Sequence, residues 1–319
     1  MNREIHRHQN KPLPQLHVGH GSHHGALSIF PLWVNSPRVT GLDWKASSIR
    51  TAEREGSPVV GELVLHNSTA RPVVALEGDL LKGGWQDRML ARSLLLEPFE
   101  ARVAEVFCVE AGRWGARPVE TQAAHEASGR RSALSVRRGN AGDGERGGSQ
   151  QSEVWQRISR FENALGATAS SSMLDHLDRS APHHARQLGA RPLDGQRGVI
   201  IGIGGRVIGA ELFGNTAGLR SRWQGILAAA ALDAQLAPRR RTTAHDARVF
   251  TRHLQGVTLE DGGDGGLARA VRSQQSRLRA SGIVNANAHT SMHTSTSAPT
   301  ASIIHLTAFD DAHPLLENA

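Results

Sequence analysis

The stretch GVIIGIGGRVIGAELF, residues 198–213, decides the fold class of this 319-residue chain. Two apolar, strand-like runs flank Gly204-Gly205-Arg206, and such a short glycine-rich link predicts a β-hairpin. The stretch nearly spells a dinucleotide-binding fingerprint. However, Val207 stands where that fingerprint needs its third glycine, and a second strand follows where it needs a helix. The sequence therefore predicts an antiparallel hairpin and excludes a Rossmann fold.

The sequence after the hairpin predicts helices and then further strands. Apolar residues at helical spacing run over about residues 216–236, and Pro238 ends this helix. A short helix is expected at residues 245–254. Apolar and polar residues alternate over parts of residues 257–309, which predicts strands separated by loops rich in Gly, Ser and Thr. The closing strand at residues 302–309 is the clearest of these strands.

The sequence before the hairpin predicts a block of antiparallel strands. Turn-forming residues separate its apolar runs, which are residues 59–66, 72–78, 85–96 and 102–109. Further along, a helix is expected to begin with Ser152 as its N-cap. We therefore expect an α+β fold with an antiparallel, β-rich core and several helices, and we assign no named superfold.

We expect a single domain over residues 26–309. Residues 1–25 are polar and rich in histidine, which predicts a mobile N-terminal segment whose histidines are solvated, so no metal site is expected. Residues 129–151 are rich in Gly, Arg and Ser and predict a disordered polar loop. Residues 310–319 are expected to form a short tail, and the cofactor, if one exists, stays open.

The charge of the chain limits its partners. The formal net charge is +7, and only three of the 37 basic residues are Lys. The Arg residues are spread along the chain, whereas nucleic-acid binders concentrate basic charge on one face or arm, which argues against nucleic acid. A phosphorylated small molecule is compatible with many Arg, because the planar guanidinium suits phosphate. Glu211, in an apolar strand, is predicted to be an edge charge.

The single cysteine excludes an intramolecular disulfide framework and any zinc site with several thiolates. No apolar run approaches roughly 18 residues, so no membrane span is expected. The first 15 residues lack the apolar core of a secretory signal. We therefore expect a reducing, cytoplasmic compartment.

Residues 76–88 form the first candidate site. Glu77 ends an apolar strand, where a carboxylate costs free energy unless it is paired. Its candidate partners are Lys82, Arg88 and Arg113. Gln86 and Arg88 are two residues apart and therefore share one strand face. The pattern fits a polar site at strand ends and a structural ion pair equally well.

Residues 107–114 form the second candidate site. Cys108 and Glu110 point the same way along a strand, because side chains repeat with period two. A neighbouring negative charge raises the pKa of a thiol, so a buried structural role for Cys108 is favoured over a nucleophilic one. Glu110 is the stronger candidate for acid–base chemistry. Arg113 and Trp114 suit the clamping and stacking of a ligand that carries a phosphate or a base.

Taken together, these two stretches resemble the ARPP-1 domain family, a domain associated with ADP-ribosylglycohydrolases and rhodanese-phosphatases. The elements that carry the resemblance are Glu77-Gly78, Gln86-x-Arg88 and Cys108-x-Glu110-x-Gly112-Arg113-Trp114. The resemblance covers most of residues 26–309, without the polar stretch at 129–151. It implies a link to NAD or ADP-ribose metabolism and a polar site. That site would comprise Glu77, Gln86, Arg88, Cys108, Glu110, Arg113 and Trp114.

Three functions follow as hypotheses. The first is a domain that processes ADP-ribose, NAD or a related phosphorylated nucleotide. Its catalytic candidates are Glu77, Glu110 and, less strongly, Cys108, and its ligand-binding candidates are Gln86, Arg88, Arg113 and Trp114. The second is a non-catalytic, β-rich module that binds a ligand or a protein. The third is weak nucleic-acid binding through the dispersed Arg, which would fall steeply with salt. Enzymatic activity and oligomeric state stay open.

Overall fold

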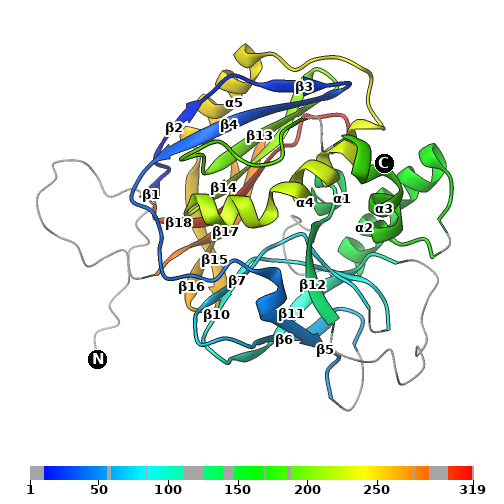
Figure 1. Ribbon diagram of the computed structural model, residues 1–319, viewed down its shortest axis with the longest axis vertical. Helices are drawn as coiled ribbons and strands as arrows, with labels where there is room; N and C mark the ends of the chain where they lie inside the picture. Colours follow the sequence, from blue (N-terminus) through cyan, green and yellow to red (C-terminus); the bar gives the residue numbers. More distant parts are fainter. Residues whose placement is uncertain are drawn as a thin grey trace, which may run out of the picture.

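The computed structural model describes residues 11–55, 59–83, 85–110, 125–138, 147–168, 170–184, 188–275, 277–286 and 301–317. Ten strands form one large antiparallel sheet in the order β1-β15-β16-β17-β18-β14-β13-β4-β2, and β3 also pairs with β4 (Figure 1). These strands are β1 (Lys11–Pro12), β2 (Gln15–Val18), β3 (Ser22–His24), β4 (Leu27–Asn35), β13 (Gly198–Ile203), β14 (Arg206–Phe213), β15 (Thr258–Gly265), β16 (Ala268–Gln275), β17 (Leu278–Asn285) and β18 (Ile303–Asp310).

A small closed barrel lies beside the large sheet (Figure 1). Its six antiparallel strands follow the order β11-β6-β5-β12-β8-β9. They are β5 (Ile49–Ala52), β6 (Glu62–Asn67), β8 (Asp79–Leu81), β9 (Arg88–Leu90), β11 (Ala101–Cys108) and β12 (His125–Arg131). A separate pair joins β7 (Val73–Ala75) to β10 (Leu94–Leu96). Aliphatic side chains of the barrel strands and of this pair form one core cluster, as the low aromatic content requires.

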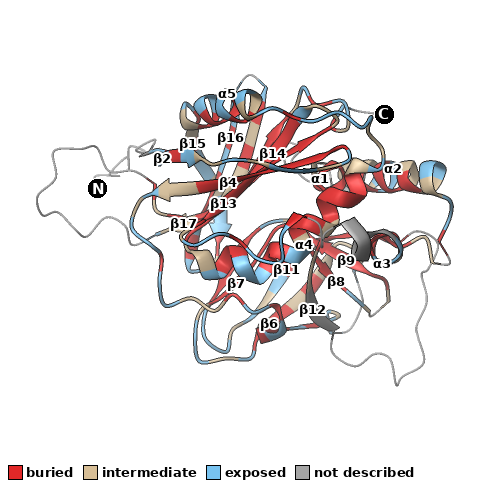
Figure 2. Ribbon diagram, turned by 45° about the horizontal axis from the view of Figure 1, so that its top comes forward, coloured by how far each residue is buried: buried red, intermediate tan, exposed pale blue. Residues whose placement is uncertain are grey.

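Helix α4 (Thr216–Ala234) lies between the large sheet and the barrel (Figure 1). Its side chains at Leu219, Trp223 and Ile226 belong to one core cluster with residues of β13 and of β7. Helix α5 (Ala244–Gln255) covers the opposite face of the sheet through Phe250 and Leu254. Because both faces are covered, β13 is buried along its whole length and β14 is buried after its first residue, Arg206. Figure 2 shows both strands mostly in red. The remaining helices are η1 (Ala46–Ser48), α1 (Leu134–Arg137), α2 (Gly147–Leu165) and α3 (Met173–His184).

The predicted α+β class with an antiparallel, β-rich core is confirmed. The hairpin is formed by β13 and β14, and Gly204 and Gly205 both have positive φ angles in its turn. The helices expected at residues 216–236 and 245–254 are α4 and α5, and the closing strand is β18. Asn215 caps α4 by accepting from the Gly218 amide, which fixes the start of the helix directly after the hairpin.

Several local predictions are wrong. Residues 11–24 are not a mobile segment, because they contribute β1, β2 and β3 to the large sheet, and residues 1–10 lie outside the described part. Residues 129–138 and 147–151 are not a disordered loop, because they belong to β12, α1 and α2 or join them. Ser152 therefore lies inside α2 and is not its cap. The strand expected at residues 85–96 is divided into β9 and β10, and the loop expected before it contains β8.

Within the described residues, no helix is both long enough and apolar enough to cross a membrane.

Candidate functional site

One cross-strand row of the large sheet carries polar side chains over five neighbouring strands. The register places Glu260, Arg272, Ser281, Thr307 and Glu211 opposite one another on β15, β16, β17, β18 and β14. Residues directly opposite in neighbouring strands point to the same face of a sheet. This polar row therefore runs along the face that looks toward the barrel, buried at its Glu211 end and exposed at its Glu260 end.

At the buried end, Glu211 binds two Arg residues that the sequence analysis assigned to a loop. Arg131 Nη2 lies 2.8 Å from Glu211 Oε2, and Arg137 Nη1 lies 2.6 Å from Glu211 Oε1. All three side chains are at most 1% exposed. The prediction that Glu211 is an edge charge is therefore wrong, because β14 lies between β13 and β18 inside the sheet.

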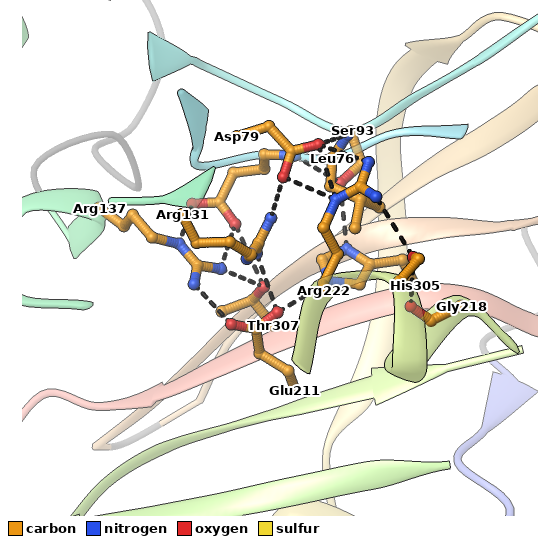
Figure 3. A network of polar contacts seen from close by, with 12 residues as sticks. Leu76, Asp79, Ser93, Arg131, Arg137, Glu211, Gly218, Arg222, His305 and Thr307 are labelled. Atoms are coloured by element: carbon orange, nitrogen blue, oxygen red, sulfur yellow. Dashed lines mark hydrogen bonds and ion pairs between the residues drawn. The ribbon is translucent and has the colours of Figure 1, made fainter. Parts of the chain in front are cut away.

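The same network contains Asp79, which Figure 3 labels, and Glu77. Arg137 binds both carboxylate oxygens of Glu77, at 3.1 and 2.8 Å. Asp79 accepts from Arg131 at 2.8 Å and from Arg222 of α4 at 2.9 Å. Three carboxylates thus face three guanidinium groups in a region with almost no exposed surface. Such a network is stable because each buried charge has an opposite charge and hydrogen bonds.

The pKa values follow from this pairing. Burial alone raises the pKa of the Glu211 carboxyl, but Arg131 and Arg137 lower it well below its ordinary value. The pKa of Asp79 is also lowered, because Arg222 and Arg131 outweigh its burial. The pKa of Arg137 is raised by Glu211 and Glu77 against the effect of burial. The carboxyl groups of Glu211 and Asp79 and the guanidinium of Arg137 are therefore ionised at neutral pH.

Local sequence features hold Glu77 and Arg137 in place. Gly78 has a φ of +79°, and a Cβ added to it would lie 2.4 Å from Nε of Arg137. Only glycine lets the backbone turn there and lets the guanidinium pass so closely. Helix α1, which carries Arg137, is held at its N-terminus by Asp233 of α4, which accepts from the Leu134 amide at 2.7 Å.

The observed partner of Glu77 differs from those expected. Its ion pair is with Arg137, not with Lys82 or Arg88, and Arg113 lies outside the described residues. Arg131 and Arg137 were missed because the sequence around them is polar and rich in glycine. The helical spacing does indicate a buried position for Arg222, since it lies on the same apolar stripe of α4 as Leu219.

A cavity of about 380 Å³ opens where the polar row leaves the buried network. Its floor contains Glu77 and Arg137. One wall is the face of β15, β16 and β17 with Glu260, Arg272, Gln274, Arg279 and Ser281. The opposite wall comes from β11 and the turn after β9, with Ala91, Arg92, Ser93, Glu105 and Phe107. A small polar ligand in this cavity would contact both the sheet and the barrel.

The basic side chains that line the cavity differ in how many hydrogen-bond and ion-pair partners they already have. Arg137 is saturated by Glu77, Glu211 and Thr307, and Arg92 is paired with Glu105. By contrast, the Arg272 side chain is exposed and makes no ion pair or hydrogen bond with any residue that the structure describes. Its guanidinium is therefore the group best able to accept an anion from solution.

The remaining predicted residues form a second polar cluster at one end of the barrel. The Arg88 guanidinium donates to Gln86 Oε1 at 3.3 Å, and the Cys108 thiol donates to the Glu110 carbonyl at 3.0 Å. One carboxylate oxygen of Glu110 accepts from the amide of Asp87 at 2.9 Å. The structure thus brings Gln86, Arg88, Cys108 and Glu110 together, but none of them lines the cavity that contains Glu77.

Arg113 and Trp114 lie outside the described residues, so their predicted roles stay predictions. The same holds for the predicted roles of Gln86, Arg88, Cys108 and Glu110, whose positions are now known. Asp87 was not singled out from the sequence. It joins this cluster to the segment before α3 by accepting from Ser172 Oγ at 2.7 Å.

Cys108 should be an inert thiol in the folded protein. Its side chain is buried, and burial raises the pKa of its thiol although the Glu110 carbonyl and Arg88 act in the opposite direction. A disulfide reagent such as dithionitrobenzoate is expected to titrate no thiol in the native protein and one thiol in denaturant. Rapid titration of one thiol in the native protein would show that Cys108 is an accessible thiolate.

The comparison with known proteins supports the family resemblance that the sequence motifs indicate. No curated protein and no solved structure matches the chain. One family model does, over residues 15–309. The matched residues include the buried network around Glu211, the polar cluster at the end of the barrel, the cavity walls and nearly the whole large sheet. The chain therefore belongs to the ARPP-1 family, the ARG and Rhodanese-Phosphatase-superfamily-associated Protein domain.

Proposed function

We propose that this ARPP-1 domain binds a small phosphorylated nucleotide of NAD or ADP-ribose metabolism in the cavity between the large sheet and the barrel. The observation that carries the proposal is the unengaged guanidinium of Arg272 on the cavity wall. It lies in the same polar row as the saturated network around Glu211. The proposal includes the cytoplasmic location that the single cysteine predicts.

The size and lining of the cavity support a small polar ligand. Its volume of about 380 Å³ falls within the range of small-molecule sites, roughly 300–1,000 Å³. Arg272 suits a phosphate, because guanidinium groups bind phosphate through paired hydrogen bonds, whereas Arg279 on the same wall already lies 3.4 Å from Asp311. Gln274 and Ser281 on the same wall offer amide and hydroxyl groups for a ribose or a base.

Glu77 has a limited role in this proposal. Both of its carboxylate oxygens already accept from Arg137, and one also accepts from Thr307 at 3.1 Å. A carboxylate so engaged is held in one position by Arg137 and Thr307. Glu77 therefore orients Arg137 and shapes the floor of the cavity. Whether the bound ligand is also turned over is a separate question.

Replacing Arg272 by Ala is expected to weaken the binding of ADP-ribose by about 10- to 100-fold. A lost charge-assisted hydrogen bond costs about 1.5–3 kcal/mol. Isothermal titration with ADP-ribose, NAD, AMP and pyrophosphate measures the effect. The matched control is Arg269→Ala, because Arg269 is on the same strand, pairs with Asp261 at 2.8 Å and does not line the cavity.

Two outcomes would contradict the proposal. One is equal affinity for the Arg272→Ala and Arg269→Ala proteins. The other is binding of short oligonucleotides alone, with an affinity that falls steeply with salt, which would favour dispersed basic charge over a nucleotide pocket.

A further inference from the structure

Ser93 on the cavity wall begins a chain of three polar side chains. Ser93 Oγ lies 3.1 Å from Nδ1 of His305, and Nε2 of His305 lies 3.4 Å from Oε2 of Glu211 (Figure 3). Ser93 lines the cavity although it is itself largely buried, and His305 and Glu211 are fully buried behind it. The order hydroxyl, imidazole, carboxylate is that of a nucleophile, its base and the group that orients the base.

The fold brings the three residues together from distant parts of the sequence. Ser93 lies in the turn between β9 and β10, while His305 and Glu211 are on the neighbouring strands β18 and β14. His305 is opposite Phe213, so it is the diagonal neighbour of Glu211 on the same face of the sheet. The imidazole therefore reaches the carboxylate on one side and the turn after β9 on the other.

The hydrogen bonds fix the direction of the chain. Ionised Glu211 can only accept, so Nε2 of His305 carries the proton and Nδ1 is the acceptor. Nδ1 therefore accepts from the hydroxyl of Ser93. The Glu77 amide donates to Ser93 Oγ at 3.0 Å, which fixes the position of the oxygen. In this tautomer Nδ1 has the free lone pair with which an imidazole can take the proton of a serine.

We propose that Ser93 is the nucleophile of an esterase site whose substrate is an acyl ester on a hydroxyl group of the phosphorylated ligand in the cavity. The substrate class rests on the proposed function, whereas the nucleophile rests on the contacts of Ser93 alone. His305 is the general base, and Glu211 is a positioning residue that holds its tautomer. Arg272 on the opposite wall holds the phosphate of the substrate.

The reaction balances without a further reagent. Ser93 Oγ bonds to the acyl carbon while its proton passes to Nδ1 of His305. The bond from the acyl carbon to the leaving oxygen breaks, and that oxygen takes the proton from His305. Water then attacks the acyl serine, gives one proton to His305 and releases a carboxylic acid, and Ser93 recovers its proton. The sum is an ester and water giving an acid and an alcohol.

Labelling of the full chain with an alkyl fluorophosphonate tests the nucleophile. We expect one phosphonate adduct in the native protein, at Ser93 by peptide mass mapping, with Ser281 on the opposite wall unmodified. Ser93→Ala should abolish the adduct. The control Ser159→Ala should keep it, because Ser159 is on α2 and bonds only to the Gln156 carbonyl. Peptide mapping of the unaltered chain gives a result even if Ser93→Ala folds poorly.

Hydrolysis of p-nitrophenyl acetate gives a second readout. Ser93→Ala should lower turnover by about 10³-fold, and Ser159→Ala should leave it unchanged. An unlabelled Ser93 in the folded protein, or equal labelling of Ser93 and Ser281, would overturn the proposal. Labelling of Ser93 that ADP-ribose does not slow, together with no binding by titration, would instead count against the nucleotide ligand and leave the nucleophile standing.

Discussion

Glu211→Gln is expected to lower the free energy of unfolding by about 3–5 kcal/mol, the range found when one partner of a buried ion pair is removed. The carboxylate neutralises Arg131 and Arg137, which it contacts at 2.8 and 2.6 Å. An amide of the same shape leaves both guanidinium groups buried with too little negative charge, and it turns a donor toward them. Urea denaturation followed by circular dichroism measures the loss.

The effect should depend on pH in a defined direction. The folded-state pKa of Glu211 lies well below the ordinary carboxyl value. The stability that its ion pairs contribute is therefore fully present above about pH 4.3, the unfolded value, and is lost as the pH falls through the folded value. Glu211→Gln should lose less stability than the unaltered protein over this acidic range.

Glu260→Gln is the matched control for this variant. Glu260 belongs to the same polar row, but it is exposed and makes no ion pair with any described residue. Its replacement should change the free energy of unfolding by no more than about 0.5 kcal/mol. Equal, small effects of Glu211→Gln and Glu260→Gln would show that the buried network does not stabilise the fold.

Gly78→Ala is expected to cost about 3 kcal/mol or more, by two separate effects. The backbone of Gly78 has a φ of +79°, and an L-residue in that conformation costs about 1–2 kcal/mol. In addition, the new methyl group would lie 2.4 Å from Arg137 Nε, so the guanidinium must move away from Glu77. Displacing it uncouples a buried charge pair, which is costly in itself. Thermal and urea denaturation measure the sum.

Gly41→Ala isolates the backbone effect. Gly41 has a φ of +82°, yet a Cβ added there would meet nothing within 4 Å. The free energy of unfolding of this variant should fall only by the roughly 1–2 kcal/mol that the strained backbone costs. If Gly78→Ala costs no more than Gly41→Ala, Gly78 is needed for its turn alone, and the close passage of Arg137 is unimportant.

The sequence predicted those parts of the fold that depend on local pattern. The hairpin of β13 and β14 follows from its apolar runs and its glycine link, and α4 follows from its 3.6-residue period. Closure of the barrel and the strand order of the large sheet depend on pairings between distant segments, such as β1 with β15. No local pattern specifies those pairings.

The sequence predicted only parts of the candidate site. The structure places Gln86, Arg88, Cys108 and Glu110 close together, because β11 pairs with β9 at Cys108 and Arg88, and their roles stay predictions. Glu77 was expected in the same cluster, but the turn at Gly78 directs its side chain to the other side of the barrel strands, toward Arg137. A polar, glycine-rich sequence normally indicates a solvated loop, so nothing local marked Arg137 as a buried residue.

The position of the bound ligand tests directly whether the ligand site is the cavity between the large sheet and the barrel. Amide hydrogen exchange of the full chain, with and without ADP-ribose, reports which backbone segments the ligand protects. We predict increased protection in β16, in β17 and at residues 91–93, which contribute to the two walls of the cavity. Unchanged exchange, or protection confined to residues 85–88 and 108–110 at the end of the barrel, would contradict a ligand site in the cavity.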